Sequence, residues 1–113
     1  MKLVVAIIKS HRVEAVTDAL DQLDVSGITL TDVRGHGRQR GHTEVYRGSE
    51  YKVDFLPKVR LDVLVKDTEA EKVANVIVAE ARTGQIGDGK LWIQPVEQTV
   101  RIRTGEIGED ALS

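Results

Sequence analysis

The sequence contains no cysteine, only two prolines and few aromatic residues. The absence of cysteine excludes disulfides, thiolate catalysis, iron–sulfur clusters and cysteine-based zinc sites. Hydrophobic residues make up 41% of the 113 residues, which excludes disordered and collagen-like chains. No apolar run reaches the length of a membrane span, and the N-terminal MKLVVAIIKSHRVEA lacks the features of a signal peptide. We therefore expect one soluble, cytoplasmic globular domain.

Positive charge is distributed unevenly along the chain. The formal net charge is −2, which argues against a general nucleic-acid coat protein. However, residues 34–60 have a balance of +4 and residues 82–103 a balance of +2, and the other segments are negative. Two basic stretches in an acidic chain indicate binding of an anion.

The first third of the chain predicts a strand, a helix and a second strand. Residues 3–8 form a continuous aliphatic run without alternation, which predicts a strand buried on both faces. Ser10 is a candidate N-cap for a helix whose apolar stripe is Val13, Val16, Leu20 and Leu23. Gly27 ends the connection, and residues 28–33 resume an extended pattern.

The second half repeats this order. Residues 57–65 alternate as a half-buried strand does, and Thr68 with Glu71 forms a capping-box pattern before a helix. A glycine-rich loop at 84–89 precedes a strand that begins at 91–93. Two such halves predict an α+β, ferredoxin-like βαββαβ sandwich formed by a single domain, 1–113. Because residues 3–8 are apolar on both faces, we expect a closed homodimer or homotrimer to cover the open face of the sheet.

The segment 35–56 between the halves is rich in glycine, charge and tyrosine. A connection of about 20 residues without structure is uncommon in a compact domain and is usually functional or disordered. A plain β-hairpin is the alternative, because 43–46 and 51–55 could pair. The bias toward arginine and tyrosine favours a binding or regulatory loop.

The loop Gly84–Lys90 has the spacing of a phosphate-binding P-loop but not its context. Leu91 stands where a serine or threonine is needed, and the loop follows a helix instead of opening one. We therefore reject a Walker-type NTPase. The glycines still allow backbone N–H groups to approach an anion, beside the charge of Lys90. The alternative is an ordinary glycine turn after a helix.

Two further arginines complete a candidate polyphosphate site. Arg101 and Arg103 are two residues apart and would share one face of an extended segment. With Arg38 and Lys90 they could form a polyphosphate cradle, although such a pair alone is commonly a solvated surface. The three histidines lack a metal-binding spacing, and no nucleophile stands out. The residues therefore favour a ligand-binding function over a catalytic one.

The chain closely resembles the PII nitrogen-regulatory signal-transduction proteins of the GlnB and GlnK type. Three segments carry the resemblance: GHGRQRGHTEVYRGSEYKVDFLPK at 35–58, ARTGQIGDGK at 81–90 and VEQTVRIRTGE at 96–106. The resemblance implies a compact homotrimer with nucleotide sites in the clefts between subunits. It implies a T-loop at 35–56, a B-loop at 82–90, and a C-loop and tail at 103–113.

The resemblance also implies the ligands and their residues. ATP and ADP would compete for the cleft, and 2-oxoglutarate would bind only with Mg-ATP. The implied nucleotide-binding residues are Ile7, Thr29, Gly37, Arg38, Gln39, Asp62, Leu64, Gly87, Asp88, Gly89, Lys90, Arg101, Ile102 and Arg103. The implied 2-oxoglutarate residues are Gly37, Gln39, Lys58 and Gly87. Gln39 would also coordinate Mg²⁺.

Regulation and partners follow from the same resemblance. Tyr51 matches a tyrosine that a nucleotidylyltransferase uridylylates or adenylylates in many members, and Ser49 matches a serine phosphorylated in others. The T-loop would contact ammonium transporters and nitrogen-metabolism enzymes or regulators, so the chain would meet a membrane only through a partner channel. Asp62 and Leu64 stand where members of the family usually have Glu and Val, so the nucleotide affinity of this chain is expected to differ from theirs.

Three functions therefore remain for comparison. The leading hypothesis is a non-enzymatic sensor of nitrogen, carbon and energy status. Slow ATP hydrolysis is an alternative, although no general base is evident. The other is a ferredoxin-like module that binds RNA or another polyanion through residues 34–60; the acidic total argues against nucleic acid.

Overall fold

The computed structural model describes residues 1–25, 27–36, 43–46, 49–52 and 55–112, with 43–46 and 49–52 described by their backbone only. The elements in chain order are β1 (Lys2–Lys9), the 3₁₀ turn η1 (Ser10–Arg12), α1 (Val13–Asp21), β2 (Ile28–Gly35), β3 (Thr43–Tyr46), β4 (Ser49–Lys52), β5 (Leu56–Val65), the 3₁₀ turn η2 (Asp67–Glu69), α2 (Ala70–Ala81), β6 (Lys90–Pro95) and the 3₁₀ turn η3 (Gly108–Ala111).

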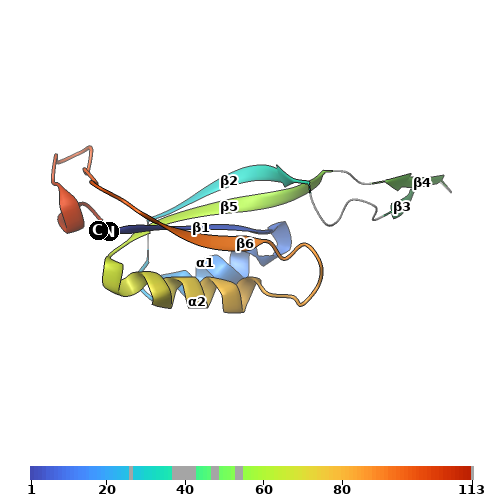
Figure 1. Cartoon of the computed structure of the whole chain (residues 1–113), viewed down its shortest axis with the longest axis horizontal. Coiled ribbons are helices and arrows are strands. Elements are labelled where there is room, and N and C mark those ends of the chain that lie inside the picture. The colour runs from blue at the N-terminus through green and yellow to red at the C-terminus, as the bar shows by residue number, and fades with distance from the viewer. Residues whose placement is uncertain (26, 37–42, 47–48, 53–54, 113) are drawn as a thin grey trace.

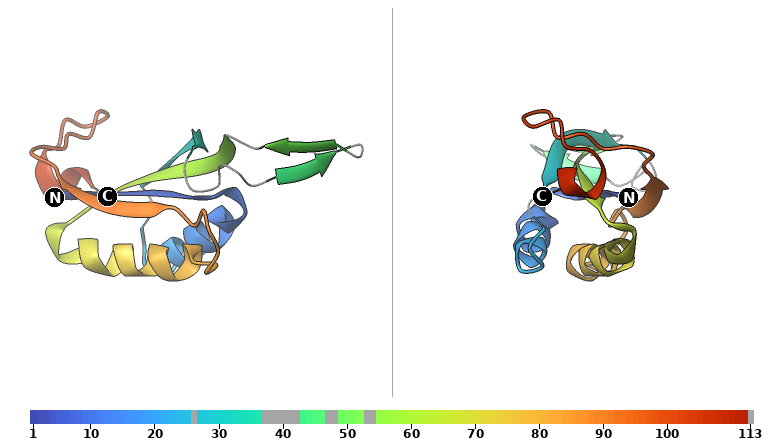
Figure 2. Two further views of the ribbon diagram at one scale, coloured as in Figure 1. Left: turned by 45° about the vertical axis from the view of Figure 1, so that its right-hand side comes forward. Right: turned by 90° about the vertical axis from the view of Figure 1, so that its left-hand side faces the viewer.

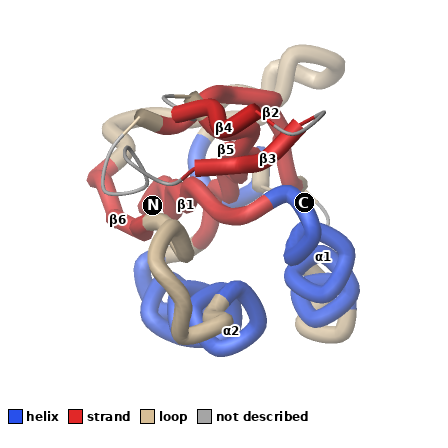
Figure 3. The backbone as a smooth tube through the Cα atoms, turned by 90° about the vertical axis from the view of Figure 1, so that its right-hand side faces the viewer, coloured by secondary structure: helices blue, strands red, loops and turns tan. Residues whose placement is uncertain are grey.

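The main sheet has the strand order β2-β5-β1-β6, and every neighbouring pair is antiparallel. Both helices lie side by side on one face of this sheet, and within the described residues no α-helix covers the other face (Figures 1 and 2). Figure 3 shows the same two layers from the end of the molecule that carries β3 and β4. The α+β, ferredoxin-like βαββαβ prediction is confirmed.

The core lies between the sheet and the two helices. Alternate residues of β1 and β5 point toward the helices and are buried, as are Val73 and Ile77 of α2. Of the stripe predicted for the first helix, Val16 and Leu20 are buried and Val13 is partly buried, whereas Leu23 lies beyond the end of α1 and is only partly buried. The core members at most 2% exposed are Val4, Ala6, Ile8, Val16, Leu20, Leu61, Val63, Val73 and Ile77.

The face of β1 that turns away from the helices is also apolar. Val5 is fully buried there, flanked in register by Asp62 and Trp92, and Leu3 and Ile7 are partly buried. The predicted burial of this strand on both faces is therefore confirmed at Val5 and partial at its neighbours.

Both predicted helix caps are wrong. Ser10 and Thr68 lie inside the 3₁₀ turns η1 and η2, and no side-chain hydrogen bond caps either helix. The backbone N–H of Val13 instead bonds the Ser10 carbonyl, and that of Ala70 bonds the Asp67 carbonyl. The tighter turns use the amides that a capping side chain would otherwise satisfy.

The segment between β2 and β5 contains a hairpin. Strands β3 and β4 pair antiparallel, with Thr43 opposite Lys52 and Tyr46 opposite Ser49, and they project beyond the end of the main sheet (Figure 1). The hairpin alternative is thus correct for 43–46, but its partner strand begins at Ser49 rather than Tyr51. The β-branched and aromatic residues of these two strands favour such pairing. The binding or regulatory role favoured for 35–56 stays a prediction.

Candidate functional site

The face of the sheet without helices carries most of the predicted binding residues. Residues directly paired across antiparallel strands point to the same face, and Ile7 pairs with both Arg60 and Lys90. Asp62 pairs with Thr29 and Val5 in the same way. The predicted residues that share this face are Ile7, Thr29, Lys58, Asp62, Leu64 and Lys90.

Lys58 lies at the end of this face nearest the hairpin and is only 5% exposed. Its ammonium donates a hydrogen bond to the Gly87 carbonyl, and Lys9 lies directly opposite it on β1. Burial and the neighbouring charge of Lys9 lower the pKa of Lys58, although Asp88 opposes the effect. The structure therefore brings together Lys58 and Gly87, both predicted to bind 2-oxoglutarate, and places Lys9 beside them, for which the sequence predicted no role.

The Asp88 carboxylate, near the end of the glycine loop, accepts hydrogen bonds from residues at the start of the loop. It accepts hydrogen bonds from the Thr83 amide (2.8 Å), the Gly84 amide (2.9 Å) and the Thr83 hydroxyl, and forms an ion pair with Lys9 at 3.2 Å. Hydrogen bonds, chiefly from Thr83, hold the pKa of Asp88 far below its ordinary value. Asp88 thus shapes the loop, and its predicted contact with a nucleotide stays a prediction.

Glycine is required in this loop for conformation and for space. Gly84, Gly87 and Gly89 have φ angles of 83°, 94° and 97°, in the left-handed region that side chains rarely adopt. A Cβ atom on Gly89 would lie 1.7 Å from the Ile7 carbonyl oxygen. The loop backbone therefore packs closely against β1, and the approach of its N–H groups to an anion stays a prediction.

Arg101 lies near the opposite end of the sheet from Lys90. Strand β6 pairs Lys90 with Ile7 at one end and Pro95 with Lys2 at the other, and the Val96 amide then bonds the Met1 carbonyl at 3.1 Å. One chain therefore does not bring Arg101 to the glycine loop. The predicted cradle is divided into two groups.

The segment around Arg101 is a turn, so the prediction of an extended pair is wrong. The amides of Thr104 and Gly105 bond the Arg101 carbonyl, which coils the chain between the bridged residues Val100 and Ile107. The two guanidiniums are consequently not placed by strand alternation. Arg103 is exposed and Ile102 is 99% exposed.

The Arg101 guanidinium contacts acceptors of its own segment. It pairs with the Glu106 carboxylate and donates to the Asp110 carbonyl at 2.6 Å. A phosphate that binds Arg101 must compete with Glu106. Arg101 and Leu64 both line a cavity of about 710 Å³ beside the loop that follows α1.

Two basic residues that line this cavity, Lys66 and Lys72, were not predicted from the sequence. Neither was Arg60, at the centre of the open face. Arg60 donates two hydrogen bonds to Asp62, at 2.9 and 3.0 Å, and its guanidinium lies 5.8 Å from the Trp92 ring centroid. Arg60 could have been found, because it precedes Asp62 by two residues on a predicted strand. No local pattern indicated the two lysines.

Several predicted residues lie outside what the structure describes. Gly37, Arg38 and Gln39 fall in a gap, so the proposed magnesium ligand has no described position. Ser49 and Tyr51 lie on β4, whose side chains are not described. In the described ranges, no three His, Cys, Asp or Glu side chains are grouped to hold a metal ion, and no helix there is long and apolar enough to cross a membrane.

Comparison with known proteins identifies the family of this chain. The family model "Nitrogen regulatory protein P-II" matches residues 1–106. The chain is 52% identical to the nitrogen regulatory protein P-II of Azospirillum brasilense and 53% identical to that of Cereibacter sphaeroides. It is 48% identical to the nitrogen regulatory protein GlnK of Escherichia coli (strain K12). Each match spans 112 residues, which are 99% of this chain and 100% of the relative. The chain belongs to the P-II family of nitrogen regulatory proteins.

Proposed function

We propose that this P-II protein binds ATP or ADP, and with Mg-ATP also 2-oxoglutarate, and thereby regulates ammonium transporters and nitrogen-metabolism enzymes. The observation that carries the proposal is the division of the predicted cationic residues. Lys58, Lys90 and the loop at 87–90 lie at one end of the open sheet face, and Arg101 lies beyond the other.

Two groups at opposite ends of one chain form a complete site when copies of the chain meet end to end. Such a head-to-tail contact uses two different surfaces and must close into a ring to give a finite assembly. The partly buried apolar residues Leu3 and Ile7 on the open face favour burial in that assembly. A homotrimer with one nucleotide site at each of its interfaces is the arrangement that we propose.

Each group has a distinct role. The loop amides at 87–90 and the Lys90 ammonium would bind phosphate oxygens, and Arg101 and Arg103 of the next subunit would complete the cradle. Ile7, Thr29, Asp62 and Leu64 would contact the adenosine. A carboxylate of 2-oxoglutarate would replace the Gly87 carbonyl as the partner of the buried Lys58 ammonium. Gln39 would hold Mg²⁺ together with the ligand oxygens.

Titration calorimetry with ADP and Mg-ATP tests the cradle. Lys90→Ala and Arg101→Ala are each expected to weaken nucleotide binding by about 1.5–3 kcal/mol, because each removes a charged contact to phosphate. Lys2→Ala removes the same charge from the helix-covered face and serves as the control. Unchanged nucleotide affinity in both cradle variants would refute the site.

The order of ligand binding is a separate test. Since the proposed 2-oxoglutarate site includes Mg²⁺ held by the ATP phosphates, we expect binding with Mg-ATP and none with ADP or with protein alone. Equal affinity of 2-oxoglutarate in the absence of Mg-ATP would contradict the proposed mechanism.

The readout to partners would pass through residues 35–56. A ligand changes the conformation of this segment only if it binds one conformation more tightly than another. Tyr51 is our proposed site of nucleotidylation, and Ser49 a site of phosphorylation. Intact-mass measurement of protein from nitrogen-starved and ammonium-replete cells tests both, and an unmodified mass under every condition would contradict them.

A further inference from the structure

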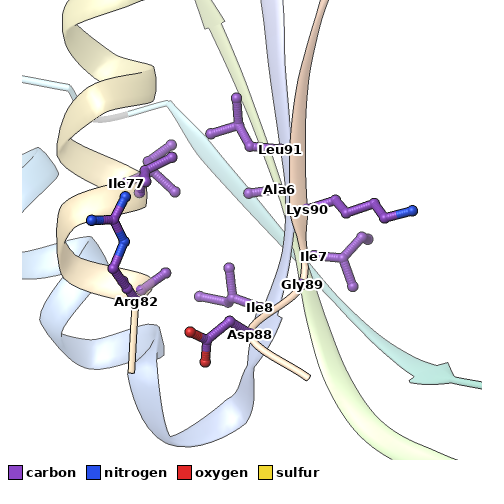
Figure 4. A pocket seen from close by; sticks show the side chains of 11 residues that line it. Ala6, Ile7, Ile8, Ile77, Arg82, Asp88, Gly89, Lys90 and Leu91 are labelled. Atoms are coloured by element: carbon purple, nitrogen blue, oxygen red, sulfur yellow. The ribbon is translucent and has the colours of Figure 1, made fainter. Parts of the chain in front are cut away.

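A smaller cavity lies on the opposite side of the sheet from the proposed nucleotide site. It has a volume of about 180 Å³ and lies between α2, β1 and the start of β6. In Figure 4, Ile8, Ile77 and Leu91 point into this space, whereas Ile7 and Lys90 point away on the far side of the sheet. The cavity is therefore distinct from the cradle, although both share the backbone of 88–90 as a wall.

The interior of this cavity is apolar. Its lining includes Ala6, Ile8, Ile77, Ala81 and Leu91, none of which carries a polar side-chain atom. Val78, which is 38% exposed, stands at the rim. An apolar cavity of about 150 Å³ accommodates one benzene ring. The space thus fits a single ring or a short branched chain.

Two charged side chains border the cavity, and only one remains available to a ligand. The Asp88 carboxylate is occupied by the donors of Thr83, Gly84 and Lys9, which fill the acceptor positions of its two oxygens. Arg82 is exposed, and its side chain makes no hydrogen bond or ion pair within the described part of the chain, although its backbone N–H bonds the Val78 carbonyl. The available charge at the rim is therefore positive.

We propose that this cavity binds a small monocarboxylate with a compact apolar body, such as one ring or a branched chain of about six carbons. The apolar body occupies the space between Ile77 and Leu91, and the carboxylate pairs with Arg82. A ligand with a second charge is disfavoured because the interior offers that charge no partner.

Occupation of the cavity also bears on the nucleotide site, a consequence that rests on the proposed function. A bound ligand contacts the inner side of residues 88–90, whose outer side would bind phosphate. Filling the cavity restricts the movement of this backbone, so a nucleotide that arrives later loses less conformational entropy. The carboxylate is therefore expected to tighten ADP binding.

The binding step is tested with benzoate and its neutral analogue benzamide on ¹⁵N-labelled full-length protein. Benzoate is expected to shift the amide signals of Ile77, Val78 and Leu91, with a dissociation constant on the order of 1 mM for so small a ligand. Benzamide has the same shape without the charge and is expected to bind about threefold more weakly, as suits an exposed ion pair. Benzoate shifts confined to the region of Lys9 and Lys58 would overturn the proposal.

Variants at the rim separate charge from shape. Arg82→Gln is expected to remove the preference for benzoate over benzamide, and Arg82→Lys to retain it. Val78→Trp places an indole over the cavity from an exposed position and is expected to abolish binding of both probes while the amide spectrum stays dispersed. An undiminished preference for benzoate in Arg82→Gln would show that Arg82 is not the partner.

The coupling is tested by measuring ADP affinity with and without saturating benzoate. About a twofold gain is expected in the wild-type protein and none in Val78→Trp. Unchanged ADP affinity in the wild type would contradict the coupling. If ADP does not bind in either condition, the proposed nucleotide function fails while the benzoate result stands separately.

Discussion

Gly89 marks the closest backbone contact of the glycine loop. Its φ of 97° and the Ile7 carbonyl, 1.7 Å from the position of a Cβ atom, both exclude a side chain. The sequence predicted glycines that let the backbone approach an anion. The structure adds that Gly89 first allows the loop to pack against β1.

Gly89→Ala is expected to lower the free energy of unfolding by about 3 kcal/mol, because it combines backbone strain with a steric clash. Gly84→Ala is the matched control, since Gly84 has a φ of 83° but nothing within 4 Å of its Cβ position. In this control the free energy of unfolding is expected to fall by about 1 kcal/mol, from backbone strain alone. Urea denaturation measures both, and equal losses would show that the contact with Ile7 is unimportant.

Asp88 is expected to make the stability of the protein depend on acid pH. Because its pKa lies far below the ordinary value of 3.8, the folded protein gains stability when this group is ionised. That gain is complete above about pH 5 and is lost as the pH falls through the unfolded-state pKa toward the folded one.

Thermal unfolding of the wild type and of Asp88→Asn between about pH 3 and pH 6 measures this effect. Near pH 6 the wild type is expected to unfold at a higher midpoint temperature than Asp88→Asn. The difference between the two midpoint temperatures is expected to narrow as the pH falls. A gap that stays constant over this range would mean that the carboxylate contributes no pH-dependent stability.

At the scale of elements, apolar periodicity predicted strands and helices well, whereas local capping patterns did not predict where the helices begin. Leu20 and Ile77, which belong to the predicted apolar stripes, are buried as expected, because burial on one face is a property of the whole element. The capping patterns at Ser10 and Thr68 gave way to 3₁₀ turns, because a turn of the backbone can satisfy the same amides.

Arg12 joins the first of these turns to the end of α2. Its guanidinium donates two hydrogen bonds, of 2.8 and 2.6 Å, to the Glu80 carbonyl, one of the last carbonyls of the helix, which have no partner within it. The Glu80 carboxylate is farther away, at 4.0 Å. The link between the two segments therefore depends on the backbone of Glu80 rather than its side chain.

Arg12→Ala is accordingly expected to destabilise the protein by about 1–2 kcal/mol, because it leaves the helix carbonyl without its charged donor. Glu80→Ala keeps the carbonyl and is expected to cost less than about 0.5 kcal/mol. Chemical denaturation compares the two. A larger loss in Glu80→Ala than in Arg12→Ala would show that the ion pair, not the carbonyl contact, holds the turn to the helix.

For the whole molecule, the main consequence of the fold is the separation of Lys90 from Arg101. Strand β6 carries the chain from the glycine loop to the other end of the sheet before Arg101 is reached. The sequence identified these cationic residues, and under the proposed function their separation in one chain means that a complete nucleotide site needs a second copy.

This division predicts that two variants with weakened nucleotide binding can restore each other. Lys90→Ala and Arg101→Ala proteins, unfolded together and refolded at equal concentration, are expected to regain tight ADP binding at about one interface in four, where intact Lys90 faces intact Arg101. Calorimetry on the mixture measures the recovered stoichiometry. The double variant Lys90→Ala/Arg101→Ala, refolded with itself, is the control. Absence of recovery in a mixture that forms mixed oligomers would place both residues in one chain's own site.

The sequence alone determined the α+β class, the order of the main-sheet elements and the basic, glycine-rich segments, because these depend on periodicity and composition within short stretches. The tertiary structure decided which of these segments meet. Lys58 joins Gly87 and the neighbouring Lys9, Arg60 pairs with Asp62, and Arg101 lies at the far end of the sheet. Strand register and the path of β6 fix these relations, and no local pattern of residues encodes contacts between strands that are distant in sequence.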